Sequence, residues 1–208
     1  MKETKEQREM MLPGNKVEIR KAEGEPTKIV GYAVRWDQLS HPIFGLFQEQ
    51  FKRGAFAASL VNPDVYAAWQ HDSREVLGRT PNTLQLFEDD IGLRYEITPP
   101  SWAEKHLETI ERGDVRGSSF IFRAIKEEWD ESNPDMAIRT VIEADIFEVS
   151  PVTTPAYPQS SVGIRSAQDV FNERRALPNM DNRGDSHAEE RLDLIMIEHD
   201  MRLRKLSI

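Results

Sequence analysis

The stretch LQLFEDDIGLRYEI, residues 84–97, holds two short runs of alternating apolar and polar residues on either side of Glu88-Asp89-Asp90. Alternation with a period of two is typical of a β-strand that buries one face, and the polar residues between the runs favour a turn. The stretch therefore predicts a β-hairpin.

Similar runs, rich in β-branched and aromatic residues, precede and follow this hairpin. They are VEIRKAEG (17–24), TKIVGYAVRW (27–36), PDVYAAWQHD (63–72), GSSFIFRAI (117–125) and AIRTVIEADIFEVSPV (137–152). Short strand-like segments divided by Gly, Pro, Asn and Asp are typical of an all-β barrel or sandwich.

Two helices are expected between these strands. Residues 101–110 begin with the capping-box sequence SWAE after two prolines, and Gly113 ends the helix. The segment GAFAASL, residues 54–60, predicts a shorter amphipathic helix. The fold class is therefore mainly β with flanking helices (α+β).

The composition divides the chain into three parts. Residues 1–16 are dominated by Lys, Glu, Gln and Arg and predict a flexible charged N-terminal arm, whereas residues 17–165 form the β domain. Residues 166–208 predict a linker and a C-terminal amphipathic helix, because a capping-box pattern at residues 186–189 precedes apolar residues at helical spacing. The partner of that apolar face could be the domain, a second copy of the chain or another protein.

Charge and cysteine content exclude several classes of function. The 208 residues include 27 Lys and Arg, 36 Asp and Glu and no cysteine, and the net charge is -9. This charge opposes binding to a nucleic-acid backbone, and the lack of cysteine excludes disulfides, zinc–thiolate sites and cysteine nucleophiles. No apolar run approaches the length of a membrane span, and no signal peptide is evident at the N-terminus. We expect no cofactor, no metal and no membrane contact, and a chain that stays in the compartment where it is made.

His71 is the histidine most compatible with catalysis. It closes the alternating row Val65, Ala67, Trp69, His71 and precedes a turn, so we expect an imidazole at the end of a strand on its apolar face. A neutral imidazole there could act as a general base. The alternative is a core histidine that bonds a backbone carbonyl, and His106 is interpreted as a packing residue of its helix.

Two serines at the start of a strand are the candidate nucleophiles. In GDVRGSSFIF, residues 113–122, Gly117 permits an unusual turn just before Ser118 and Ser119. The two side chains point to opposite faces, and alternation does not decide which of them faces His71. The alternative is an ordinary Ser-Ser turn that enters a strand.

Glu148 ends an apolar row formed by Ile142, Ala144 and Ile146. A carboxylate in that place is costly unless it is paired, so it could orient an imidazole or bond an arginine such as Arg35, Arg79 or Arg94. His71, one serine and Glu148 together would supply a base, a nucleophile and an orienting acid.

Three of these segments resemble the tailed-bacteriophage prohead maturation protease family. They are WQHDSREVLGRT (69–80), RGDVRGSSFIF (112–122) and DIFEVSPVTTPAYP (145–158), and GYAVRWDQ (31–38) with FKRGAFAASL (51–60) resembles the N-terminal portion of the family. The resemblance covers about residues 17–164. It implies a serine endopeptidase with a closed or partly open β-barrel of the herpesvirus-protease type, surrounded by helices.

Within this resemblance, His71 is the general base and Ser119 the nucleophile, the second position after the glycine in the family's Gly-x-Ser-Phe pattern. Glu148 is the acidic third member. The chain departs from the pattern at Ser118, where many members have an apolar residue, and at Ile121, where they have glycine. Ser118 therefore stays a rival nucleophile. The resemblance assigns no oxyanion donor, for which Arg139 and Arg123 are candidates.

The resemblance also implies partners and a location. The substrate would be the scaffolding region of the major capsid protein, and the enzyme would work inside the immature capsid, or prohead, in the host bacterial cytoplasm. The chain itself would be a second target through autocleavage, and a second copy could form a homodimer. We expect the tail, residues 166–208, to hold autocleavage sites or to dock on the scaffold. The alternatives are a catalytically inactive β-barrel factor of capsid assembly and an esterase-like hydrolase of small molecules.

Overall fold

The computed structural model describes residues 5–10, 17–43, 45–115, 117–133 and 136–153. The chain divides into two units, residues 1–170 and 171–208. All described residues belong to the first unit. The predicted C-terminal helix and the linker before it lie outside the described residues.

The described residues are mainly β, as predicted. The strands are β1 (Glu6–Met10), β2 (Glu18–Arg20), β3 (Lys28–Arg35), β4 (Phe47–Phe51), β5 (Tyr66–Trp69), β6 (Asp72–Arg79), β7 (Leu84–Glu88), β8 (Gly92–Ile97), β9 (Gly117–Asp130) and β10 (Ala137–Val152). A 3-10 turn η1 (Ser101–Ala103) leads into the helix α1 (Glu104–Glu111).

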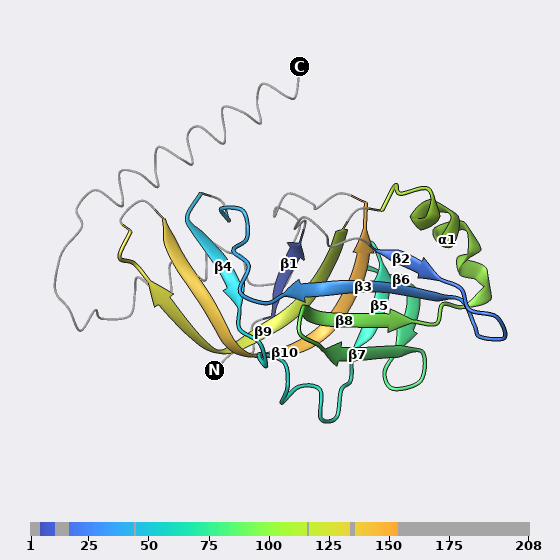
Figure 1. Cartoon of the computed structure of the whole chain (residues 1–208), viewed down its shortest axis with the longest axis horizontal. Coiled ribbons are helices and arrows are strands. Elements are labelled where there is room, and N and C mark those ends of the chain that lie inside the picture. The colour runs from blue at the N-terminus through green and yellow to red at the C-terminus, as the bar shows by residue number, and fades with distance from the viewer. Residues whose placement is uncertain (1–4, 11–16, 44, 116, 134–135, 154–208) are drawn as a thin grey trace, which may run out of the picture. The chain divides into compact units, whose positions relative to one another are not determined.

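These strands form two sheets. The larger has the order β1-β9-β10-β5-β6, with β4 also paired to β10, and the smaller has the order β2-β3-β8-β7. The two longest strands, β9 and β10, bend along their length and curl the larger sheet into a half-barrel (Figure 1). Within the described ranges, an isolated parallel bridge between Trp36 and Phe51 links the ladders of the two sheets.

The predicted hairpin and the longer helix are confirmed. Strands β7 and β8 pair in antiparallel register, with Glu88 opposite Leu93, and the turn between them is bound by the Asp89 carboxylate, which accepts from the amides of Ile91 and Gly92. Helix α1 ends before Gly113, whose positive φ of 79° suits glycine. No side chain caps the helix N-terminus, so the capping box predicted at Ser101 is not formed.

The predicted helix over residues 54–60 is wrong, because the segment is a series of turns. Only isolated turn bonds form within it, from the Ala57 amide to the Gly54 carbonyl and from the Leu60 amide to the Phe56 carbonyl. Other backbone groups bond distant residues: the Phe56 amide donates to the Glu88 carboxylate, and the Ala55 carbonyl accepts from the Ala144 amide. Phe56 is fully buried among core aromatic side chains. Tertiary contacts therefore replace part of the regular helical bonding that the local pattern favours.

The structure also differs from the expected flexible arm at residues 6–10, which form β1. This strand pairs with β9 in antiparallel register, and the side chain of Glu6 is fully buried. The composition of the arm gives little apolar surface for ordering, but the ladder with β9 and buried ion pairs supply the contacts instead.

Aromatic side chains form the part of the core that lies beneath the larger sheet. Phe51, Phe120 and Phe122 are fully buried, and their ring centroids are 5.2–5.5 Å apart. Because side chains alternate along a strand, this burial of the even-numbered residues of β9 directs Ser119 and Ile121 to the opposite face. Among the described helices, none is long and apolar enough to cross a membrane.

Candidate active site

His71 lies in a tight turn rather than in the strand row that the sequence predicts. Strand β5 ends at Trp69, which pairs with Asp72 of β6, so Gln70 and His71 form a two-residue hairpin loop. Both have positive φ, 54° and 62°, a conformation that a type I′ turn requires and that side chains other than glycine and Asn disfavour. Such strain persists only where the surroundings hold the backbone.

Contacts with the end of β10 hold this turn. The Gln70 amide donates to the Pro151 carbonyl, and the His71 amide donates to Ser150 Oγ, each at 3.3 Å. The imidazole is thereby fixed above the face of the sheet that carries Ser119.

The two serines point to opposite sides of β9, as alternation requires. Ser118 shares the core side, where its Oγ lies 2.8 Å from the hydroxyl of the buried Tyr95. Ser119 faces the other way, and its Oγ lies 2.5 Å from His71 Nε2. The structure therefore brings Ser119, and not Ser118, to the imidazole.

Glu148 reaches the same face through a β-bulge. Ile146 pairs with Phe122 but Glu148 pairs with Ile121, so Phe147 is an extra residue on β10. Immediately before the bulge Ala144 and Ile146 face the core, and after it Val149 faces the core while Glu148 and Ser150 face the Ser119 side. The predicted continuous row from Ile142 through Glu148 is thus wrong, because the register of β10 shifts after Val141 and again after Ile146, and each shift reverses the face that the following side chains use.

The three side chains form a continuous hydrogen-bonded chain. Glu148 Oε1 lies 2.6 Å from His71 Nδ1, on the ring side opposite Ser119. With the proton on Nδ1 facing the carboxylate, Nε2 has a free lone pair toward the hydroxyl of Ser119. The arrangement can transfer a proton from Ser119 to His71 while Glu148 fixes the tautomer.

Two further side chains hold Glu148, and neither was identified from the sequence. The Tyr66 hydroxyl donates to Oε2 at 2.6 Å, and Ser150 Oγ donates to Oε1 at 2.8 Å. Burial alone would raise the pKa of Glu148, but hydrogen bonds from His71, Tyr66 and Ser150 more than offset it and hold that pKa below its usual value. Ser150 could have been found from its i+2 spacing to Glu148, whereas Tyr66 depends on the parallel pairing of β5 with β10.

The other histidines among the described residues lie away from this chain of bonds. His106 is buried and stacks on Trp69, with ring centroids 4.1 Å apart and Glu75 3.0 Å from Nε2, in agreement with its interpretation as a packing residue. His41 is exposed. Among the described side chains, no group of three or more histidines and carboxylates could hold a metal ion.

The two arginines considered as oxyanion donors are engaged by carboxylates. Arg139 is fully buried and pairs with Glu6, Glu49 and Glu127, and Arg123 pairs with Asp145. Two of the three arginines named as alternative partners of Glu148 pair with other carboxylates: Arg79 with Asp64, and Arg94 with Glu96.

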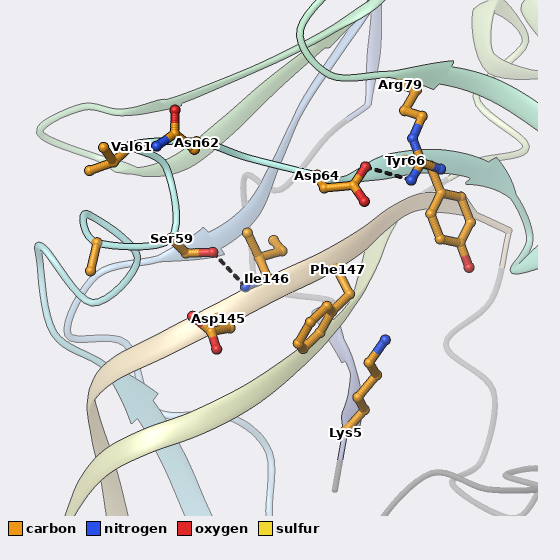
Figure 2. Close-up of a pocket in the computed structure, with 11 residues that line it drawn as sticks. Lys5, Ser59, Val61, Asn62, Asp64, Tyr66, Arg79, Asp145, Ile146 and Phe147 are labelled. Atoms are coloured by element: carbon orange, nitrogen blue, oxygen red, sulfur yellow. Dashed lines mark hydrogen bonds and ion pairs between the residues drawn. The ribbon is translucent and has the colours of Figure 1, made fainter. Parts of the chain in front are cut away.

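An open pocket of about 610 Å³ lies beside the site, lined by the 58–64 loop, Tyr66, Arg79 and the bulged part of β10. Figure 2 shows Tyr66 at one end of this pocket, and the side chains of Lys5 and Phe147 directed toward one another at its base. Because Tyr66 also bonds Glu148, the pocket adjoins the chain of bonds through that residue.

A comparison with protein-family models matches residues 15–173 to the family described as caudovirus prohead serine protease. No curated protein and no solved structure matches the chain. The matched span contains His71, Ser119 and Glu148, and β1 lies before it.

Proposed function

The chain belongs to the caudovirus prohead serine protease family, and from this we propose that it is the endopeptidase that cleaves the scaffolding portion of the major capsid protein during capsid maturation. The observation that carries the proposal is the position of His71, with Nε2 2.5 Å from Ser119 Oγ and Nδ1 2.6 Å from Glu148. Because the chain has no cysteine, a cysteine nucleophile is excluded, and a serine activated by a neighbouring base can carry out acyl transfer instead.

In the proposed reaction, Ser119 Oγ bonds to the scissile carbonyl carbon while its proton passes to His71 Nε2. The bond from that carbon to the amide nitrogen then breaks, and the nitrogen leaves with the proton from His71. Water then adds to the acyl carbon and gives a proton to His71. The bond from that carbon to Ser119 Oγ breaks, His71 returns the proton to Ser119 Oγ, and the new carboxyl end is released. General-base assistance of this kind contributes about 10²- to 10⁴-fold in rate.

Glu148 is the residue that positions the base. Its carboxylate keeps the Nδ1 proton in place and stabilises the imidazolium that forms during the attack. Tyr66 and Ser150 are positioning residues, because they bond Glu148 and do not contact the reacting atoms.

The family supports contact with capsid proteins and a location inside the prohead in the host bacterial cytoplasm. Autocleavage of the tail and a barrel of the herpesvirus-protease type belong to the same proposal. The half-barrel sheet supports the barrel part of it.

Co-expression with the cognate capsid protein tests the proposal. Wild type and the matched control Ser118→Ala should shorten the capsid protein, as seen by intact mass, whereas Ser119→Ala and His71→Ala should leave it at full length. Equal shortening by all four proteins would overturn the assignment. A fluorophosphonate probe should label wild type and Ser118→Ala but not Ser119→Ala, which separates an active serine from an inactive assembly factor.

A further inference from the structure

Strand β1 covers the candidate nucleophile. Its residues run antiparallel to β9, with Glu9 opposite Ser119 and Glu6 opposite Phe122. In this arrangement Ser119 has no exposed surface. Another peptide can therefore reach Ser119 along this side of β9 only if β1 moves away.

The backbone of β1 places a peptide carbonyl next to the hydroxyl of Ser119. Ser119 Oγ lies 2.9 Å from the carbonyl oxygen of Arg8 and 2.5 Å from His71 Nε2. The hydroxyl has one proton and cannot serve both acceptors at once. The carbonyl of Arg8 thus stands beside the nucleophile and competes with the base for its proton.

The charged side chains of β1 lie in a buried site whose side chains carry the opposite charges. Glu6 receives two bonds from Arg139, at 2.6 and 2.9 Å, and Arg8 Nε donates to Glu49 at 2.7 Å. Arg139 is fully buried and Glu49 is 2% exposed. Buried charges of this kind are costly unless each has a partner of opposite sign.

The order of the two charges matters to this site. Because Glu6 and Arg8 are two residues apart, both side chains project to the same side of the added strand. An acidic residue then meets Arg139, and a basic residue two positions later meets Glu49. Reversing the two charges would place like charges together in a dry environment.

We propose that the edge of β9 between Ser118 and Phe122 is the substrate-binding site, which takes a peptide as an added antiparallel strand and selects the pattern Glu-x-Arg. Residues 6–10 occupy it in this structure, and the substrate is cleaved after the arginine by the step written above. The inference rests on the proposed function. The proposed binding mode is a common one, because many proteins bind a peptide as an added strand of a sheet. The strand β1 that occupies the site here lies before the span that matches the family.

The pocket in Figure 2 extends this site by one residue. Lys5 precedes the acidic residue of the pattern, and its Nζ lies 3.9 Å from the ring centroid of Phe147. A cation over an aromatic face is favourable. A basic residue before Glu-x-Arg is therefore part of the expected substrate pattern.

Quenched fluorescent peptides test the selectivity on the full-length protein. The peptides are KEQREMM, which copies residues 5–11, the charge-reversed KRQEEMM and the neutral KQQQEMM. We expect KEQREMM to be cleaved after arginine, as identified by mass, and at least about tenfold faster than the other two. Equal rates for the three peptides, or cleavage elsewhere, would overturn the inference.

The rate of Ser119 labelling by a fluorophosphonate probe tests the occupancy. Arg8→Gln removes an ion pair that holds β1 against the sheet, so we expect Ser119 to be labelled about fivefold faster than in wild type. Arg20→Gln is the matched control, because Arg20 is largely exposed on β2, and it should be labelled at the wild-type rate. Equal labelling of all three proteins overturns the inference and leaves the proposed function intact. Absence of labelling and of capsid cleavage from every protein means that the proposed function has failed. If Arg8→Gln does not fold, the peptide rates on wild type decide the matter.

Discussion

Ser119 and Glu148 face the same side of the sheet because Phe147 is inserted between Ile146 and Glu148 as a β-bulge. Without that extra residue, the alternation of β10 would turn the carboxylate toward the buried phenylalanines of β9. A carboxylate buried in the apolar core without a partner would be costly. The bulge instead places the carboxylate of Glu148 within hydrogen-bond distance of His71.

Replacing Glu148 by Gln tests the contribution of this charge to catalysis. The amide keeps the size of the side chain but cannot stabilise an imidazolium, and it can favour the wrong tautomer of His71. We expect kcat for KEQREMM or capsid cleavage to fall by about 10²-fold or more, with an unchanged KM. A kcat within twofold of wild type, in a folded protein, would show that Glu148 does not orient the base.

Replacing Tyr66 by Phe tests the support of Glu148. The variant loses the hydrogen bond at Oε2, so the pKa of Glu148 rises toward its ordinary value of 4.5. We expect a loss of about 1.5 to 3 kcal/mol in the free energy of unfolding at neutral pH, the range for a bond to a charged group. A carboxylate with a lowered native pKa stabilises the fold above its unfolded pKa, so the difference from wild type should shrink as the pH falls below about 4.5.

Tyr32→Phe is the matched control, because the Tyr32 hydroxyl donates to Asp89 at 2.7 Å in the other sheet. Both variants should lose stability, but only Tyr66→Phe should slow the labelling of Ser119. Denaturant melts across pH and the labelling rates measure the two effects. Equal labelling rates in the two variants would argue against a role for Tyr66 in positioning the site.

Much of the fold could be predicted because its signals are local. The hairpin of β7 and β8 follows from alternation around a turn, and α1 follows from a helical pattern that ends at Gly113. The turns of the segment 54–60 could not be predicted, since two of its backbone groups bond Glu88 and Ala144, which are distant in the sequence.

The candidate residues of the site could be proposed from their type and order, but their geometry could not. Alternation left Ser118 and Ser119 equivalent, and only the direction of the core distinguishes them. The bulge at Phe147 and the positive φ of His71 result from tertiary contacts, and no local sequence pattern predicts either feature. Strand β1 was missed because its stabilising ion pairs involve Glu49 and Arg139, far along the chain.

Replacing Ser118 by Ala separates stability from catalysis at neighbouring serines. Ser118 bonds the fully buried hydroxyl of Tyr95, and its loss leaves that hydroxyl without this partner. We expect the free energy of unfolding to fall by about 1 to 3 kcal/mol, while Ser119 is labelled at the wild-type rate. Chemical denaturation and probe labelling check this, and a loss of labelling in the folded variant would reopen the choice of nucleophile.

Replacing His106 by Phe tests a pH dependence that lies outside the site. Burial lowers the pKa of His106 below 6.5, against the opposing charge of Glu75, so the folded state favours the neutral ring stacked on Trp69. As the pH falls below 6.5 the unfolded chain takes up the proton first, and the wild-type protein should lose stability by at most about 1.4 kcal/mol per pH unit from this group. The phenylalanine keeps the stack and cannot be protonated, so the slope of unfolding free energy against pH between pH 6.5 and 5 should be smaller by that amount.

His41→Phe, at an exposed histidine, should keep the wild-type slope. Thermal melts across this range compare the three proteins, and parallel curves for wild type and His106→Phe would refute the assignment of the pH dependence to His106.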